Sequence, residues 1–376
     1  MKRIVIVEPN HSHEEVLSPL IQLLRCDYNI HVVAPQTLFD IDILSATSEY
    51  YHAVPFIKVF PKSRIVRVMG IIHKYFIIRK LVDQIDPVVV LFNSVPTLLD
   101  AFLVSFLFRK RLKIQVIHNF QNYFSTVGKL LYRTFDGSLV ISEQVYHYVK
   151  AHHPDFKGID YVLPIYFDDF LKAIGSQLPS VSMDVECLKL GVFGSIQDAR
   201  RNYSGLLDSL KRMHDASGML RFRIYLVGKA PQWLQDEIKS NGLEHVVEIY
   251  QTFVPFRKMF EILAEMDIVL FLIDNHVHNA QYYNRYKITG TSTLMKAFKK
   301  AGASSTDFPV DDLLVDCCYF YQSVDIGNFL SRINNGEISL ADIQCKVVKY
   351  GQEQEFCFST QQARLVSMIQ RVTGIV

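Results

Sequence analysis

R-I-V-I-V, at Arg3–Val7, is a short β-branched run that ends at the loop Glu8–Asn10. Beyond this loop, Glu14–Leu24 repeats leucine and valine at helical spacing, and Tyr28–Ala34 is a second apolar strand closed by a proline. A strand, a helix and a second strand of these lengths predict a βαβ unit. The fold class predicted from this stretch is therefore α/β with a parallel sheet.

The same alternation continues along the chain in two blocks. In the first block we predict strands at Val88–Phe92, Lys113–His118, Gly137–Ile141 and Asp160–Ile165, and helices at Pro96–Phe108 and Gln121–Tyr132. In the second we predict strands at Leu188–Phe193, Phe222–Val227, Val246–Ile249, Asp267–Ile273 and Val315–Phe320, and helices at Asn202–Met213, Gln232–Asn241, Val254–Glu265 and Ser359–Val372. The stretch between the blocks is rich in Gly, Ser and Pro and lacks a period. We expect domains at 1–172 and 187–357, a linker at 173–186, and a last helix within 358–376.

Composition narrows the class of protein. The 376 residues are 49% hydrophobic and 21% charged, which predicts folded domains rather than a disordered chain. A net charge of only +2 argues against a nucleic-acid partner. The six cysteines include no C-x-x-C pair, the chain starts with a strand rather than a signal peptide, and no apolar run reaches membrane-spanning length. We expect free thiols and a cytoplasmic protein.

Tyr286–Lys300, reading Y-K-I-T-G-T-S-T-L-M-K-A-F-K-K, is the strongest candidate for a ligand site. Small polar residues, of the kinds that start helices, follow a lysine and precede a helical run that we place at Thr293–Lys300. A helix start offers unpaired backbone N–H groups and the positive end of the helix dipole. With a cation beside it, this arrangement suits a diphosphate. The residues concerned are Lys287, Thr289, Gly290, Thr291 and Ser292. The alternative is an ordinary capped surface helix.

Three stretches of the second block resemble the donor-binding domain of a GT-B glycosyltransferase, close to family 4. They are Leu190–Leu210, Arg223–Gly228 and Met259–Leu272, which are similar to the family's glycine loop, second strand and helix–Asp–strand unit. The resemblance implies two Rossmann-like domains facing a cleft, an N-terminal acceptor domain and a C-terminal nucleotide-sugar domain, with the last helix crossing back to the first. It places Gly194, Ser195, Gly228, and Arg200 or Arg201 at the donor diphosphate. The alternative for the two arginines is a solvated pair.

One departure from family 4 stands out. The family carries two glutamates separated by seven residues around this helix, and the matching positions here are Ile288 and Lys296. Neither carboxylate is present, so whether the sugar's configuration is retained or inverted is left open.

The first block offers candidate general bases. The loop after the first strand contains Glu8, His11, His13 and Glu14, and His118 follows another strand. We select His118, His13 and Glu14 as catalytic candidates. The alternatives are a polar helix cap for the loop and a structural histidine at the strand end.

The expected function is transfer of a sugar from a nucleoside-diphosphate donor to a saccharide acceptor, which we expect to be lipid-linked, in assembly of a bacterial surface polysaccharide such as lipopolysaccharide or capsule. No cofactor and no metal are expected, since cations and backbone amides are present to neutralise the diphosphate. Lys62–Lys80 carries six cations and no acid among apolar residues, which predicts a basic amphipathic helix that contacts an anionic membrane surface. The alternatives are a domain helix for this segment, and a nucleotide-sugar 2-epimerase or a non-catalytic sugar-nucleotide-binding protein for the whole chain.

Overall fold

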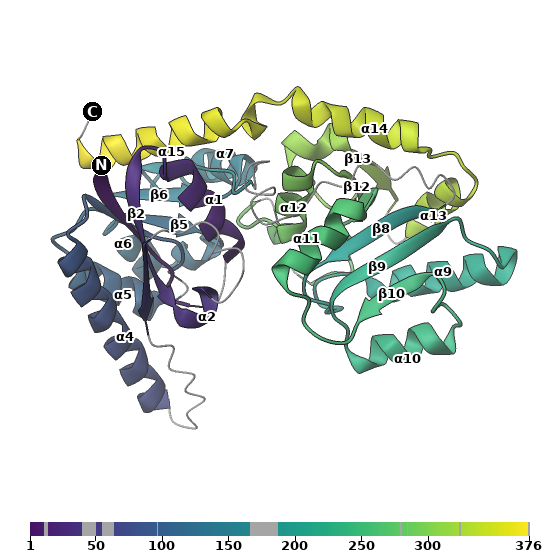
Figure 1. The fold of residues 1–376 in the computed structure, drawn as a ribbon, viewed down its shortest axis with the longest axis horizontal. Helices are drawn as coiled ribbons and strands as arrows, with labels where there is room; N and C mark the ends of the chain where they lie inside the picture. The colour runs from purple at the N-terminus through teal and green to yellow at the C-terminus, as the bar shows by residue number, and fades with distance from the viewer. Residues whose placement is uncertain are drawn as a thin grey trace. The chain divides into compact units, whose positions relative to one another are not determined.

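The computed structural model describes residues 1–10, 14–39, 50–54, 64–95, 97–165, 187–278, 280–283, 285–322 and 325–374. These residues form two compact units (Figure 1). Unit 1 contains the described residues of 1–165, the short segment Arg285–Ile288, and the end of the chain from Cys357. Unit 2 contains the described residues of 187–283 and Thr289–Phe356.

Unit 1 is built on a seven-stranded parallel sheet in the order β3-β2-β1-β4-β5-β6-β7. The strands are β1 (Lys2–Val7), β2 (Tyr28–Pro35), β3 (Tyr50–Val54), β4 (Val89–Phe92), β5 (Lys113–Ile117), β6 (Gly137–Val140) and β7 (Ile159–Tyr161). Ile4 pairs with Ile30 on one side and with Val89 on the other. The central strands are buried along their length because apolar clusters cover both faces, as parallel sheets require.

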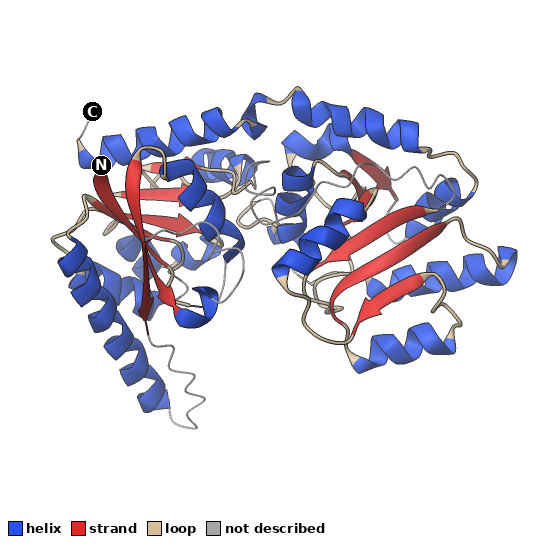
Figure 2. Cartoon of the chain, viewed as in Figure 1, coloured by secondary structure: helices blue, strands red, loops and turns tan. Residues whose placement is uncertain are grey.

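Helices cover both faces of this sheet (Figure 2). One cluster contains side chains of α1 (Glu14–Leu24) and α15 (Phe358–Thr373), and the other contains side chains of α4 (Arg64–Ile85) and α5 (Leu98–Leu107). The remaining elements of unit 1 are α2 (Gln36–Phe39), η1 (Phe120–Tyr123), α6 (Thr126–Tyr132) and α7 (Glu143–His152). Within unit 1 the last helix is fixed by Gln361, whose side chain accepts a hydrogen bond from the backbone of Leu163.

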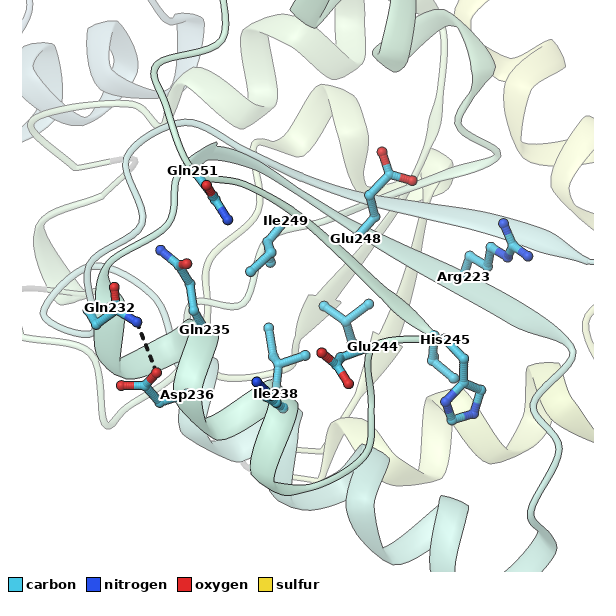
Figure 3. A pocket seen from close by; sticks show the side chains of 13 residues that line it. Arg223, Gln232, Gln235, Asp236, Ile238, Glu244, His245, Glu248, Ile249 and Gln251 are labelled. Atoms are coloured by element: carbon cyan, nitrogen blue, oxygen red, sulfur yellow. Dashed lines mark hydrogen bonds between the residues drawn. The ribbon is translucent and has the colours of Figure 1, made fainter.

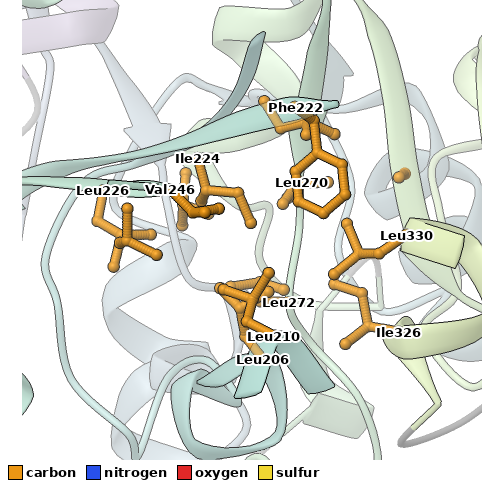
Figure 4. Packing of buried hydrophobic residues seen from close by; sticks show 14 of the residues in the cluster. Leu206, Leu210, Phe222, Ile224, Leu226, Val246, Leu270, Leu272, Ile326 and Leu330 are labelled. Atoms are coloured by element: carbon orange, nitrogen blue, oxygen red, sulfur yellow. The ribbon is translucent and has the colours of Figure 1, made fainter. Parts of the chain in front are cut away.

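Unit 2 repeats the design with a six-stranded parallel sheet in the order β10-β9-β8-β11-β12-β13. The strands are β8 (Leu188–Phe193), β9 (Phe222–Lys229), β10 (Val247–Tyr250), β11 (Ile268–Leu270), β12 (Ala301–Ser305) and β13 (Cys318–Tyr321). The longer helices are α9 (Tyr203–Ser217), α10 (Gln232–Ser240), α11 (Phe256–Glu265), α12 (Gly290–Phe298), α13 (Ile326–Asn334) and α14 (Leu340–Val348), and the short ones are η2 (Ala280–Tyr282), η3 (Asp312–Cys317), η4 (Lys349–Gly351) and η5 (Gln354–Phe356). Its largest core joins Phe222 and Leu226 of the sheet to Leu206, Leu210 and Leu330 of the helices (Figure 4).

The predicted α/β class and both parallel sheets are confirmed, and all six cysteines are free. Two strands were not predicted. β12 reads A-G-A-S-S and carries no large apolar residue, because α12 packs tightly on it: a Cβ on Gly302 would lie 2.7 Å from the sulfur of Met295. The other strand, β3, is an edge strand of its sheet. The ten residues that precede it in the sequence, 40–49, lie outside the described residues.

Two predicted elements are wrong in detail. Gln121–Tyr132 is not one helix, because Ser125 caps a new helix by accepting a hydrogen bond from the backbone of Gly128. The strand predicted at Val315–Phe320 starts three residues late, because Asp311 accepts from the backbone of Leu313 and starts η3. The predicted linker at 173–186 lies outside the described residues.

A histidine pair on the β2–β3 edge predicts a pH-dependent stability. Nδ1 of His31 lies 3.0 Å from Nε2 of His52, and burial lowers the pKa of both, with the charge of Arg3 adding to the shift at His31. A lowered pKa means that the folded state favours the neutral rings, so this stabilisation is complete above about pH 6.5 and is lost as the pH falls below it. When the pH is lowered from 7.5 to 5.5, we expect the melting temperature of His52→Gln to fall by less than that of the wild type. The exposed His73→Gln is the control and should lose as much as wild type; equal losses in all three proteins would contradict the prediction.

Candidate functional site

Two glycines shape the carboxyl ends of β8 and β9 in unit 2. Gly194 follows β8 with φ +106°, a conformation that favours glycine. A Cβ on Gly228 would lie 2.2 Å from the carbonyl oxygen of Gly194, so only glycine allows the two backbones to approach this closely. Gly194 and Ser195 are exposed, and Gly228 packs against the backbone of Gly194.

Arg201 holds this loop to the start of α12. It is 7% exposed, and its Nη2 donates to the carbonyl of Phe193 at 2.7 Å and to the hydroxyl of Thr291 at 3.0 Å. Its Nη1 donates to the carbonyl of Ser195 at 3.2 Å. The planar guanidinium carries five N–H donors in fixed directions, so it can hold three acceptors in a defined arrangement around it. The alternative of a solvated arginine pair is therefore wrong for Arg201, while Arg200 is exposed.

The start of α12 is largely buried and is accessible to solvent at Gly290. The helix begins at Gly290, three residues before the predicted start, and the N-cap Thr289 accepts a hydrogen bond from the backbone of Thr291. Gly290 is exposed, with open space where a Cβ would stand. Ser292 is 2% exposed, and its hydroxyl has no hydrogen-bond partner among the described residues. The N–H groups of Thr291 and Ser292 already donate to the hydroxyl and the carbonyl of Thr289, so an anion at this helix start would bind at Gly290 or take the place of these acceptors.

Asn202 and Asp274 brace the same strand ends, and neither was selected from the sequence. The backbone of Asn202 donates to the carbonyl of Leu272, and its amide donates to Asp274 at 2.6 Å. Leu272 has φ +52°, a strained conformation for a branched side chain, and Asp274 is buried. The usable signal was an aspartate directly after the apolar strand ending in F-L-I.

Lys296 stands where the resembling family has its second glutamate, and it is engaged inside unit 2. Its ammonium lies 2.7 Å from the carboxylate of Asp311, and the two side chains are only 5% and 2% exposed. The pair ties α12 to the start of η3. Lys296 is therefore part of a buried structural ion pair.

Unit 1 has its own polar cluster at the carboxyl ends of β1 and β4. Glu8 is fully buried and accepts hydrogen bonds from Asn93 at 2.8 Å, from Ser94 at 2.7 Å and from the backbone of Asn10 at 2.9 Å. Buried carboxylates are kept in folded proteins when donors surround them in this way. His118, after β5, is joined to the cluster because its Nε2 lies 2.7 Å from the carbonyl oxygen of Asn93.

Lys74 corrects part of the predicted membrane helix. It lies on α4, but its ammonium turns inward and donates to the carbonyl of Pro9 at 2.9 Å and to the side chain of Asn10 at 3.3 Å. Burial lowers the pKa of Lys74, and the carboxylates of Asp100 and Glu8 oppose that shift. Lys74 therefore belongs to the polar cluster and not to an outer basic surface.

The other predicted residues are placed as follows. Lys287 belongs to unit 1, where its backbone pairs with Asn119 next to His118, whereas Thr289, Gly290, Thr291 and Ser292 belong to unit 2. Ile288 packs against the core of unit 1. His13 lies outside the described residues, and Glu14 starts α1 with its side chain outside them.

In the described part of the chain, no group of three His, Cys, Asp or Glu is placed to hold a metal ion. Asp40 and Asp42 form an Asp-x-Asp pattern, whose carboxylates suit a divalent cation, but they lie within a range that the structure does not describe. The absence of a metal therefore stays a prediction.

Unit 2 also has a hollow beside β10, an edge strand of its sheet. It is formed by α10 and the strand segment around β10, and the side chains of Gln232, Gln235 and Gln251 border one end (Figure 3). The site predictions did not include this pocket.

No family model matches the sequence, and no curated protein matches it. Solved structures do match. Sucrose-phosphate synthase from Thermosynechococcus elongatus is similar with a TM-score of 0.67 at 10% identity over 100% of both chains. HepE from Anabaena, in complex with UDP, gives 0.62 at 12% identity over 99% of this chain and 100% of that one. UDP-GlcNAc 2-epimerase from Neisseria meningitidis, bound to UDP-GlcNAc, gives 0.62 at 8% identity over 99% and 100%.

These similarities and the two parallel sheets define the class of protein by its fold: the chain is a GT-B protein with two Rossmann-like units. The structures that share this fold include both sugar transferases and epimerases, so the fold leaves open which reaction this chain performs.

Proposed function

We propose that the protein is a glycosyltransferase that uses a nucleoside-diphosphate sugar as donor. The observation that carries the proposal is the set of hydrogen bonds from Arg201 to Phe193, Ser195 and Thr291, which we call the Arg201 clamp. This clamp fixes the Gly194 loop beside the start of α12. Ligands of parallel α/β sheets bind at the carboxyl ends of the strands, and phosphates favour helix N-termini. The site in unit 2 combines both features.

The proposed chemistry needs stabilisation of the leaving diphosphate. The backbone N–H groups at Gly290–Ser292 are held in place by the fold, and those of Thr291 and Ser292 would exchange their acceptor Thr289 for the diphosphate. Arg200 is exposed next to the glycine loop and is the cation that we assign to the phosphates from unit 2. Arg201 holds the loop and does not contact the donor.

For the acceptor we propose unit 1, with Glu8 and His118 near the hydroxyl that is glycosylated. A histidine at a strand end suits a general base. The acceptor that we propose is a saccharide, lipid-linked at the inner face of the cell membrane during surface-polysaccharide assembly. Lys287, beside Asn119, is a further candidate for the phosphates.

A nucleotide-sugar 2-epimerase is the second candidate, because UDP-GlcNAc 2-epimerase matches 99% of this chain, compared with 100% for sucrose-phosphate synthase. The two reactions differ in what they consume. A transferase releases the nucleoside diphosphate only when an acceptor is present, whereas an epimerase interconverts two sugar nucleotides without one.

The experiment is a panel of UDP-, GDP- and ADP-sugars screened first by thermal shift, since a bound donor raises the melting temperature. Each hit is then incubated with and without a mixture of saccharide and lipid-linked acceptors, and the products are separated by chromatography. Acceptor-dependent release of nucleoside diphosphate supports the proposal. A new sugar nucleotide formed without acceptor supports the epimerase, and tight binding with no product supports a non-catalytic protein.

A further inference from the structure

Positive charge is concentrated in one segment of the chain. Residues 64–133 contain eleven Lys and Arg against three Asp and no Glu, a net charge of +8, although the whole chain carries only +2. The rest of the chain is therefore acidic, at −6. Such separation of charge indicates a surface for an anionic partner.

The same segment exposes apolar side chains. In the described residues, ten of the eighteen large apolar side chains that are exposed lie between Ile65 and Leu130. Six of them lie on three consecutive helices, and we refer to them together as the outer apolar face: Phe76, Leu98, Phe102, Phe106, Val127 and Leu130. α5 packs beside α4 and beside α6, so the three helices are neighbours (Figure 1).

Half of these side chains lie along one side of α5. Leu98, Phe102 and Phe106 repeat every four residues and so line one side of α5. Phe102 and Phe106 are 56% and 60% exposed, and their rings stack with centroids 6.3 Å apart. The opposite side of α5 is in the core through Leu103, Val104 and Leu107. The exposed side chains of α5 therefore do not belong to the core of unit 1.

Cations border this face, and the nearby acids are neutralised. Asp83 pairs with Arg79 and Arg111, and Asp86 also pairs with Arg111. Asp100 is buried. The cations that remain exposed are Lys80, Arg109, Lys110 and Arg133. A shallow groove on α4 joins both properties, since Phe76 lines it together with Arg79 and Lys80.

We propose that the outer apolar face docks unit 1 onto an anionic lipid bilayer. Apolar side chains that enter the interface, surrounded by Lys and Arg at headgroup level, are what a peripheral membrane surface requires. The face is broad and carries both charge and aromatic groups, and no described helix is long and apolar enough to cross a bilayer. The proposal does not depend on which sugar chemistry the protein performs.

The test is co-sedimentation of the full chain with vesicles of phosphatidylcholine alone or with 30% phosphatidylglycerol. We expect binding to the anionic vesicles only, weakened at high salt because the attraction is screened. Phe102→Ser/Phe106→Ser should bind at least tenfold more weakly, and Arg109→Ser/Lys110→Ser about twentyfold, since each cation near an anionic surface contributes roughly a factor of five. The matched control, Met219→Ser/Val348→Ser, removes two exposed apolar side chains of unit 2 and should bind like wild type.

All four changed residues of the test variants are exposed, so we expect unchanged melting temperatures, which confirms that each variant is folded. Two results overturn the proposal. One is failure of the wild type to bind anionic vesicles, or equal binding by all variants. The other is a wild-type dimer in solution that Phe102→Ser/Phe106→Ser converts to a monomer, which makes the face a subunit interface.

Discussion

Replacing Asp311 by alanine is expected to lower the free energy of unfolding by about 3–5 kcal/mol, the loss measured when one partner of a buried ion pair is removed. The carboxylate of Asp311 and the ammonium of Lys296 are 2.7 Å apart and almost completely buried. Without Asp311 the lysine charge stays in the protein interior without its partner, and the backbone of Leu313 loses its cap. Urea denaturation followed by circular dichroism measures the change.

Two further variants isolate the cause. Lys296→Met/Asp311→Leu removes both charges and should recover most of the lost stability, because a buried pair contributes little beyond its own desolvation. Asp215→Ala breaks the exposed pair with Lys211 and should cost less than about 1 kcal/mol. If Asp311→Ala behaves like Asp215→Ala, then Lys296 is not a structural residue and its place at the family's carboxylate position needs another explanation.

Replacing Arg201 by glutamine is expected to weaken binding of the nucleoside diphosphate about tenfold to a hundredfold, and also to lower the melting temperature. Three acceptors, the carbonyls of Phe193 and Ser195 and the hydroxyl of Thr291, lose charged donors worth about 1.5–3 kcal/mol each in a buried setting. The glycine loop and the start of α12 then lose their common anchor. Isothermal titration with UDP, GDP and ADP reports affinity, and thermal unfolding reports stability.

Neighbouring arginines provide the controls. Arg200→Gln changes the same charge at an exposed position, so we expect a weaker affinity with an unchanged melting temperature. Arg221→Gln lies at the opposite end of β9 and should alter neither. If a folded Arg201→Gln protein binds the nucleoside diphosphate with wild-type affinity, then Arg201 does not support the binding site.

The sheets were predictable because the periodicity is strong. The strand cores around Val5, Val90 and Val192 are continuous apolar runs, as burial on both faces demands. β12 escaped prediction because its small residues reflect packing against α12, which is a tertiary constraint that no local pattern shows. Short-range caps, such as Ser125, also moved helix boundaries by a few residues.

The sequence predicts which residues come together at the candidate site better than it predicts what each of them does there. Gly194, Arg201 and Thr291 were selected from spacing and resemblance, and the structure brings them together in unit 2. Only burial separates the roles that we propose for the two arginines. Arg201 is buried and positions the loop, whereas Arg200 is exposed and can contact a ligand. Lys74 was misassigned because a helix of mixed composition does not show which cation turns inward.

Binding of the donor diphosphate by unit 2 can be tested by a crystal structure of the protein with a nucleoside diphosphate bound. We expect phosphate oxygens within hydrogen-bonding distance of the backbone N–H groups at Gly290–Ser292, beside the Gly194 loop. A diphosphate bound elsewhere, for example in the hollow between α10 and β10, would contradict it.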